Sequence, residues 1–526
     1  MTGVSHVTGF EAPVPLLPEI LALHGKWRGH KSAVIFENSR LSWAEFCADN
    51  HRFAHGLLAR GVKPGDRVGI VMSNGLPMLQ ALFGSMAAGA VSVPINLSVS
   101  DEAMLGMLQD AGVTALVVSA DQQSRLQALL PALPASLSLR VSAAEAAADD
   151  WLGLAELCHQ QPAGLPDLAL DGEAPLNIIY SSGTTGLPKG ILHSHRTRRD
   201  WAYDLSIALR YTGAARTLLT IGLYSNISWV AMLCTVLAGG TLVLHRRFDS
   251  DDFLATVARE RITHTAMVPI QFQRVVERLA DGDHDVSTMQ AMMSCGSPLH
   301  EGLKREIFAR FPCGIIELYG LTEGIITTLE PEDAQGRWSS VGQPLLGTDL
   351  CIVSDDDRVL GPNQTGEITG RGRITMPGYW GREDANRAAE FVDPQGRQWL
   401  RSGDLGYMDE QGFLYIVDRK KDMILSGGQN IYPQDIEAVL VQHPAVDDVA
   451  VIGVASRRWG ETPLALVVRS AGAGDSAGEL LAWTNQRLGR QQRLVDLCLV
   501  DQLPRNPNGK ILKRELRQQY AQLQYE

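Results

Sequence analysis

The stretch Tyr180-Ser-Ser-Gly-Thr-Thr-Gly-Leu-Pro-Lys-Gly190 combines three glycines, four Ser or Thr hydroxyls and one lysine. It follows residues 176–180, a short apolar run with β-branched side chains that predicts a buried strand. Glycines bring backbone N–H groups close to a ligand, and Lys189 adds a positive charge. The stretch therefore predicts a polyphosphate-binding loop, although a plain surface loop has the same composition. It is not a Walker A loop, because Gly190 rather than Ser or Thr follows the lysine.

Composition excludes several other classes of protein. The 526 residues carry 47 basic and 59 acidic side chains, a formal charge of −12, which argues against a groove for nucleic acid. The seven cysteines are scattered and odd in number, so we expect neither a zinc site nor a disulfide framework, and a reducing compartment, the cytoplasm, is expected. We find no signal peptide, and the apolar residues 229–244 are too short to span a membrane.

The pattern along the chain predicts an α/β fold. Helices of 3.6-residue periodicity, such as residues 43–60 and 77–88, alternate with short apolar strands up to about residue 340, which indicates sheets covered by helices on both faces. Residues 133–150 are weakly patterned and are expected to be a peripheral connection. Short strands and turns then predict a β-rich subdomain, and about the last 100 residues predict a small α+β lid beyond the polar run at residues 418–422.

Four further stretches carry side chains suited to a nucleotide. They are Glu317-Leu-Tyr-Gly-Leu-Thr-Glu323, Trp399-Leu-Arg-Ser-Gly-Asp-Leu-Gly406, residues 418–433, and Leu503-Pro-Arg-Asn-Pro-Asn-Gly-Lys-Ile-Leu-Lys513. An aromatic ring can stack on a base, and a carboxylate can ligate Mg²⁺ or bond ribose hydroxyls. A lysine on a proline-stiffened loop can donate charge to a transition state. Taken singly, each stretch is also typical of an ordinary turn or solvated surface.

His193 and His195 form a His-Ser-His sequence. If both lie on one strand, they share a face and resemble a metal-binding pair. No third ligand is close in sequence, so a metal site is disfavoured.

Together and in this order, the five stretches resemble the adenylate-forming superfamily of acyl- and aryl-CoA synthetases, luciferases and adenylation domains. The resemblance covers essentially the whole chain. It implies a large N-terminal domain, residues 1–418, and a mobile C-terminal lid, residues 419–526. It also implies ATP, Mg²⁺ and CoA as ligands: a carboxylate displaces pyrophosphate from ATP to give acyl-AMP, and a thiol then takes the acyl group.

The resemblance assigns roles to matching residues. Those implied to hold ATP or AMP are Ser181, Ser182, Gly183, Thr184, Thr185, Gly186, Lys189, Gly296, Ser297, Pro298, Tyr319, Gly320, Thr322, Asp404 and Arg419. Thr322, Glu323 and Lys510 are the implied catalytic residues, with Glu323, and less strongly Thr185, as Mg²⁺ ligands. Lys421 is the implied hinge of the lid. Gly427 and Gly428 are implied to serve the thioester step.

The expected acyl pocket comprises Asn226, Trp229, Met267, Gln271 and Ile325. Amino-acid-activating relatives place an Asp near residue 226, but residues 223–229 contain no acid, so an amino acid is disfavoured. An aryl or a medium or fatty acyl acid fits the apolar wall, which indicates fatty-acid or aromatic-acid metabolism. CoA is the favoured acceptor; a carrier-protein phosphopantetheine thiol is the alternative. An oligomer is possible.

Three other classes of function are weaker alternatives. A luciferase-like oxidation would share every nucleotide motif. A non-catalytic nucleotide-binding regulator is disfavoured because Lys510, Glu323 and Asp404 are all present, and a polyanion-binding protein is disfavoured by the acidic charge balance.

Overall fold

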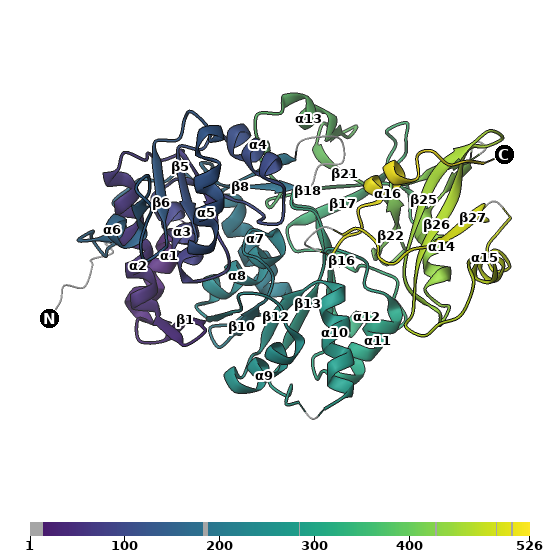
Figure 1. The fold of residues 1–526 in the computed structure, drawn as a ribbon, viewed down its shortest axis with the longest axis horizontal. Helices are drawn as coiled ribbons and strands as arrows, with labels where there is room; N and C mark the ends of the chain where they lie inside the picture. Colours follow the sequence, from purple (N-terminus) through teal and green to yellow (C-terminus); the bar gives the residue numbers. More distant parts are fainter. Residues whose placement is uncertain are drawn as a thin grey trace. The chain divides into compact units, whose positions relative to one another are not determined.

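The computed structural model describes residues 14–181, 188–282, 284–426, 429–490, 492–505 and 509–525. The chain divides into two compact units (Figure 1). The first comprises residues 1–338, 344–349 and 371–389, and the second comprises residues 339–343, 350–370 and 390–526.

One sheet of the first unit carries the strand that precedes the glycine-rich stretch. Its order is β19-β9-β8-β4-β3-β5-β6-β7. The bounds are β3 (Arg67–Val71), β4 (Val91–Pro94), β5 (Ala115–Val118), β6 (Leu139–Ser142), β7 (Leu152–Gly153), β8 (Pro175–Ser181), β9 (Lys189–Ser194) and β19 (Gly378–Tyr379). β3 to β7 and β8 pair in parallel, and β4 and β5 are wholly buried, as expected for strands covered on both faces. β8 and β9 are antiparallel, with Ser181 opposite Lys189.

A second sheet of this unit runs in the order β15-β14-β13-β12-β10-β11-β1-β2. The bounds are β1 (Ser32–Phe36), β2 (Ser39–Ser42), β10 (Arg216–Leu219), β11 (Thr241–Leu244), β12 (His264–Met267), β13 (Ala291–Ser294), β14 (Ile316–Gly320) and β15 (Ile326–Leu329). The strands from β1 through β14 in this order pair in parallel, whereas β2 pairs antiparallel with β1 and β15 pairs antiparallel with β14. The carboxyl ends of β12, β13 and β14 therefore meet at one edge of the sheet.

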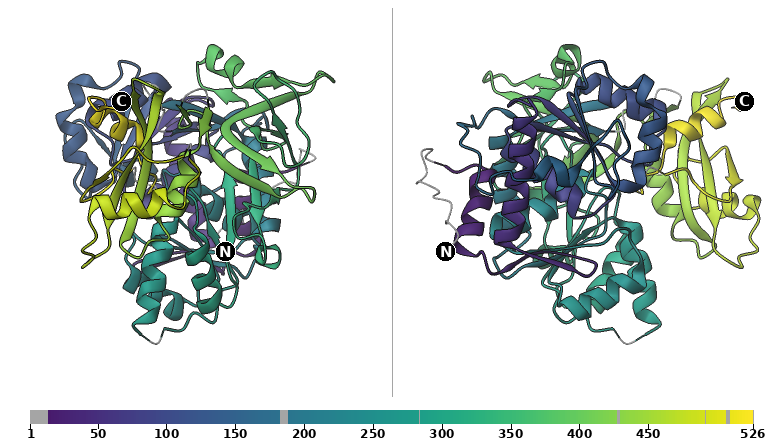
Figure 2. Two further views of the ribbon diagram at one scale, coloured as in Figure 1. Left: turned by 90° about the vertical axis from the view of Figure 1, so that its right-hand side faces the viewer. Right: turned by 60° about the vertical axis from the view of Figure 1, so that its left-hand side comes forward.

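Helices cover these sheets. They are α1 (Leu17–Trp27), α2 (Trp43–Ala59), α3 (Leu76–Ala87), α4 (Asp101–Ala111), α5 (Ala120–Ala128), α6 (Leu154–Cys158), α7 (His195–Ala208), α8 (Asn226–Ala238), α9 (Ser250–Glu260), α10 (Pro269–Ala280), α11 (Glu301–Arg310), α12 (Pro331–Ala334) and α13 (Glu383–Ala388). α9, α10 and α11 share a core that includes Phe253, Phe272 and Ile307, and they lie together at the lower end of this unit in Figure 1 and in both views of Figure 2.

Local chemistry sets the helix ends. At α2, the Ser42 hydroxyl accepts a hydrogen bond from the Glu45 N–H while the Glu45 carboxylate accepts from the Ser42 N–H, which satisfies two donors at the helix start. At α8, the Ser225 hydroxyl accepts from Ile227 N–H, and the helix ends at Gly239 in the left-handed conformation.

The second unit contains two sheets. β17 (Thr348–Val353), β18 (Gly366–Gly372), β20 (Glu390–Val392), β21 (Gln398–Met408) and β22 (Leu414–Arg419) form one. β23 (Ile424–Ser426), β24 (Gln429–Ile431), β25 (Val446–Ser456), β26 (Gly460–Arg469), β27 (Asp496–Leu499) and β28 (Gln524–Tyr525) form the other. The helices of this unit are α14 (Pro433–Leu440), α15 (Ala477–Asn485) and α16 (Lys513–Gln519).

The predicted α/β class and its covered sheets are confirmed. One local prediction is wrong. Residues 133–150 contain the strand β6, which pairs with β5 on one side and β7 on the other, so this stretch is not only a peripheral connection. His195 is the first residue of α7, so His193 and His195 do not lie on one strand, and the condition for a metal-binding pair is not met. The boundary at residue 418 stays a prediction. No helix in the described part of the chain has the length and apolar character needed to cross a bilayer.

Candidate active site

Predicted adenine-binding and acyl-pocket residues follow neighbouring parallel strands. Met267 is the last residue of β12, Gly296-Ser-Pro298 come directly after β13, and Tyr319-Gly320 end β14. The carboxyl ends of parallel strands are the usual ligand edge of an open α/β sheet. The sheet therefore brings together residues that lie more than 50 positions apart in the sequence.

Thr322 and Glu323 occupy a tight turn between β14 and β15. The N–H of Leu321 donates to the carbonyl of Ile325 at 2.9 Å, and the N–H of Gly324 donates to the carbonyl of Leu321 at 3.1 Å. Gly324 has a φ of +107°, and a Cβ there would lie 2.2 Å from the carbonyl oxygen of Ile374. Only glycine fits this turn without displacing the backbone. The turn thus fixes where the two predicted catalytic residues stand.

Glu323 is held by a tyrosine that sequence analysis missed. The Tyr379 hydroxyl donates to Glu323 Oε1 at 3.0 Å, and the N–H of Met376 donates to the Glu323 carbonyl at 2.8 Å. Lys189 Nζ lies 4.8 Å from the centre of the Tyr379 ring. Burial, with the Glu323 carboxylate adding to it, raises the pKa of Tyr379, so the hydroxyl keeps its proton and donates it. Tyr379 therefore links the predicted phosphate lysine to the predicted Mg²⁺ ligand.

Thr322 is fixed by a buried histidine. His193 Nε2 lies 2.8 Å from the Thr322 carbonyl oxygen, so Nε2 carries the hydrogen and donates it. Burial holds the pKa of His193 well below its ordinary value, with the nearby Arg198 charge adding to the effect. A neutral His193 is therefore a positioning group for the turn.

The predicted acyl-pocket residues do not all share one core: Trp229 packs in the cluster that contains Ala266, whereas Met267 packs with Phe272 in the cluster of α9, α10 and α11. Trp229, Met267 and Ile325 are fully buried. The Trp229 indole N–H donates to the Leu223 carbonyl at 2.9 Å, which fixes the ring. Gln271 caps α10 by accepting from the Val268 N–H at 3.4 Å, a structural task that the sequence did not indicate. Asn226 begins α8, and its Oδ1 is buried without a hydrogen-bond partner among the described residues.

In the second unit, Asp404 and Arg419 stand opposite each other on β21 and β22. Arg419 Nε lies 3.2 Å from Asp404 Oδ1, and Asp404 is buried. Asp404 follows a glycine in a strand, so the reading of this stretch as an ordinary turn is wrong. The two residues predicted to hold the ribose are thus adjacent.

Lys510 belongs to the same cluster. It is partly buried, and burial lowers its pKa to about 7; Arg419 and Lys421 add to this shift, while Asp404 and Asp422 oppose it. The pKa of the Lys510 amine is therefore set by side chains that lie about 100 positions earlier in the sequence. An amine with a lowered pKa among cations is a typical anion-binding and catalytic environment.

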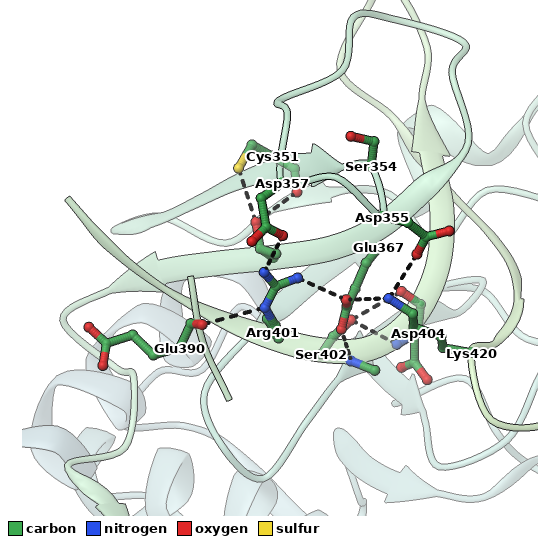
Figure 3. A network of polar contacts seen from close by, with 12 residues as sticks. Cys351, Ser354, Asp355, Asp357, Glu367, Glu390, Arg401, Ser402, Asp404 and Lys420 are labelled. Atoms are coloured by element: carbon green, nitrogen blue, oxygen red, sulfur yellow. Dashed lines mark hydrogen bonds and ion pairs between the residues drawn. The ribbon is translucent and has the colours of Figure 1, made fainter. Parts of the chain in front are cut away.

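A carboxylate that the motifs did not single out supports this cluster. Glu367 on β18 accepts from Arg401 Nη1 at 3.1 Å, from Lys420 Nζ at 3.2 Å and from the Gly403 N–H at 3.2 Å (Figure 3). Arg401 and Lys420 also pair with Asp357 and Asp355. Glu367 thereby fixes the backbone immediately before Asp404. Only its position in a strand of alternating polarity marks it in the sequence.

Some of the predicted site residues lie outside the described part of the chain. They are Ser182, Gly183, Thr184, Thr185, Gly186, Gly427 and Gly428. The side chain of Ser181 also lies outside it. Their roles stay predictions.

The chain matches the profile of the AMP-binding enzyme family over residues 24–380 and that of the AMP-binding enzyme C-terminal domain over residues 435–510. It is 32% identical to the long-chain-fatty-acid–CoA ligase FadD13 of Mycobacterium tuberculosis over 92% of this chain and 93% of that protein. It is 33% identical to a feruloyl-CoA synthase of Amycolatopsis sp over 94% and 96%. The o-succinylbenzoate CoA synthetase of Bacillus subtilis in complex with its acyl-adenylate intermediate superposes with a TM-score of 0.83 and 29% identity, covering 96% and 99%.

Proposed function

The chain belongs to the AMP-binding enzyme family, and from that premise we infer that it is an ATP-dependent carboxylic acid–CoA ligase. In the first step a carboxylate oxygen attacks the α-phosphorus of ATP, and pyrophosphate leaves. In the second step the CoA thiol takes the acyl group, and AMP leaves. The observation that carries this inference is the cluster of Lys510, Asp404 and Arg419, together with near-full-length similarity to CoA ligases.

We propose that the described residues divide the first step between them. Two anions must approach each other, so the transition state requires added positive charge, which Lys510 supplies at the carboxylate and α-phosphate. Lys189 would hold the β- and γ-phosphates, and Asp404 would accept hydrogen bonds from ribose hydroxyls. Charge-assisted hydrogen bonds of this kind contribute about 1.5–3 kcal/mol each.

We propose Glu323 as the residue that would hold Mg²⁺. Its carboxylate is the hard oxygen ligand that Mg²⁺ prefers, and the Tyr379 hydroxyl orients it. When bound, the ion would neutralise phosphate charge. Within the protein, the turn and Tyr379 keep Glu323 in place.

The acid is proposed to be a non-amino-acid carboxylate, aryl or medium to fatty acyl. Residues 223–229 carry no acid to pair an α-ammonium, and the buried Trp229 and Ile325 are apolar. CoA is the proposed acceptor, because the relatives reported above are CoA ligases; a carrier-protein thiol is the second candidate. The scattered cysteines support a reducing compartment, the cytoplasm.

The test is pyrophosphate release with MgATP across aryl, short, medium and long carboxylic acids, each with and without CoA. The proposal expects acid-dependent pyrophosphate, and CoA-dependent AMP and thioester in equal amounts. Acid-dependent pyrophosphate without a CoA thioester would move the acceptor to a carrier protein. No acid-dependent pyrophosphate with any acid would overturn the ligase assignment.

A further inference from the structure

Arg198 is a fully buried cation in the first turn of α7. Its Nε donates to Asn177 Oδ1 of β8 at 2.9 Å. The guanidinium carbon lies 4.7 Å from the centre of the Trp201 ring and 5.0 Å from that of Trp229, so the group contacts both indoles. Such cation–π contacts stabilise a cation, and more strongly in a desolvated site than at the surface.

This environment leaves most of the guanidinium unsatisfied. Among the described residues, no acceptor bonds Nη1 or Nη2, which together carry four N–H donors. Burial alone lowers the pKa of Arg198, to about 9, and no described carboxylate opposes that shift. Burying a charge without a partner raises the free energy of the folded protein. A bound anion that pairs with the charge would offset this cost.

Arg198 lies near residues of both the predicted acyl pocket and the predicted α-phosphate site. On one side, Trp229 belongs to the predicted acyl pocket. On the other, the Arg198 charge acts on His193, whose Nε2 donates to the carbonyl of Thr322 beside the predicted α-phosphate position. His193 Nδ1 is likewise buried without a partner among the described residues. The unsatisfied cation thus lies against Trp229 of the predicted acyl pocket and is buried, not at a remote surface.

We propose that the acid activated by this enzyme carries a second carboxylate, which pairs with the Nη1 and Nη2 donors of Arg198. The substrate class is therefore a dicarboxylic acid, with the apolar wall at Trp229 contacting the segment between its carboxylates. This inference rests on the proposed ligase function. A planar guanidinium matches a carboxylate in bidentate geometry, which a lysine does not. The same charge repels an α-ammonium and so adds to the exclusion of amino acids.

The competing explanation is structural: Arg198 would only brace Trp201 and Trp229, with water bonding its free donors. The two explanations differ in what they predict for substrate choice. A brace affects all acids equally, whereas a carboxylate partner affects only acids that carry the second anion.

The test uses matched acids that differ only in the second carboxylate: linear dicarboxylic and monocarboxylic acids of equal length, and aryl keto acids with and without a ring carboxylate. kcat/KM for acid-dependent pyrophosphate release is measured for the full chain, Arg198→Gln, Arg198→Lys and the control Arg199→Gln. Arg199 is a neighbour on the same helix that already pairs with Asp200. Thermal unfolding and ATP binding show whether each variant is folded.

We expect the unsubstituted enzyme to prefer its best dicarboxylic acid over the matched monocarboxylic acid by about 100-fold or more. Arg198→Gln should reduce that ratio to about 1 while changing kcat/KM for the monocarboxylic acid by less than about threefold. Arg198→Lys should restore part of the ratio. Arg199→Gln should leave the ratio unchanged. A preference for monocarboxylic acids, or an equal loss for both acids in Arg198→Gln, would overturn the inference and leave the ligase function standing. No acid-dependent pyrophosphate at all would overturn the ligase function itself, and this inference with it.

A second measurement needs no variant. Two acyl-sulfamoyl adenosines, one with and one without the distal carboxylate, are compared as inhibitors of the unsubstituted enzyme. We expect tighter inhibition, by about 100-fold, from the compound with the carboxylate. Equal inhibition would contradict the assignment even if Arg198→Gln failed to fold.

Discussion

At the scale of single residues, the proposed chemistry depends on one amine. Lys510 stands among two cations and two carboxylates of the same unit, and its lowered pKa of about 7 follows from burial first and from Arg419 second. A bound polyphosphate would reverse the balance of charge around it, because added anions stabilise the protonated form. Lys510 is thus prepared to take up a proton when the anionic reactants bind.

Removing that amine should affect only one half-reaction. We expect Lys510→Met to slow acyl-AMP formation by about 100- to 1,000-fold or more, because the charge that develops between carboxylate and phosphate is left unopposed. Thioester formation from preformed acyl-AMP and CoA should change by less than about threefold. Single-turnover assays of each half-reaction measure the two rates. The reverse pattern would show that Lys510 serves the thiol step.

The lowered pKa can be read directly by amine labelling. Because the pKa in the folded protein lies below that of an ordinary lysine, Lys510 loses its proton as pH rises through about 7, whereas an ordinary lysine keeps it until about pH 10.4. At pH 8 Lys510 should therefore be acylated faster than the exposed Lys63, and ATP should protect it by raising its pKa. Competitive labelling followed by peptide mass spectrometry gives both rates. Labelling of Lys510 at the rate of Lys63, with no effect of ATP, would contradict this environment.

At the scale of elements, sequence predicted most strands and helices because their apolar periodicity is strong. The helices predicted over residues 43–60 and 77–88 are α2 and α3, which end within one residue of those bounds. β6 was missed because an Ala/Ser-rich stretch gives little periodicity, and its strand state comes from pairing with β5. The predicted nucleotide residues Asp404 and Arg419 proved adjacent, whereas Tyr379 was missed, since nothing in its spacing ties it to Lys189 and Glu323.

The turn between β14 and β15 is the element that most depends on one residue. Gly324→Ala forces a Cβ against the Ile374 carbonyl and a left-handed backbone on an alanine. We expect a loss of about 1–3 kcal/mol in the free energy of unfolding, and slower acyl-AMP formation because Thr322 and Glu323 are displaced. Denaturant unfolding and pyrophosphate release measure the two effects.

Gly302 supplies the matched control for that change. It lies in α11, and a Cβ there would meet no atom within 4 Å. Gly302→Ala should leave activity unchanged and raise the free energy of unfolding by about 0.5–1 kcal/mol. Equal effects of the two substitutions would mean that the turn is not strained by a side chain.

At the scale of the whole molecule, the role proposed for Lys510 differs between the two half-reactions. We propose that acyl-AMP formation needs Lys510 at the phosphate, whereas thioester formation needs the CoA thiol to reach the carbonyl carbon. We propose that the lid, residues 419–526, rotates about Lys421 between the steps. The segment around Lys421 is suited to this, because Arg419 bonds Asp404 on one side and Asp422 bonds Arg517 on the other, while the Lys421 side chain is exposed.

Fixing the backbone at the proposed hinge should separate the half-reactions. Proline holds φ near −65° and restricts the preceding residue, so Lys421→Pro should stabilise one lid orientation. We expect one half-reaction to fall by about 100-fold or more and the other by less than about threefold, as measured in separate single-turnover assays. Lys421→Ala is the control, since it removes the side chain and leaves the backbone free, and both half-reactions should persist. If Lys421→Pro slowed both steps equally, or neither, rotation about this residue would be wrong, and the thiol would have to reach acyl-AMP without a change of lid orientation.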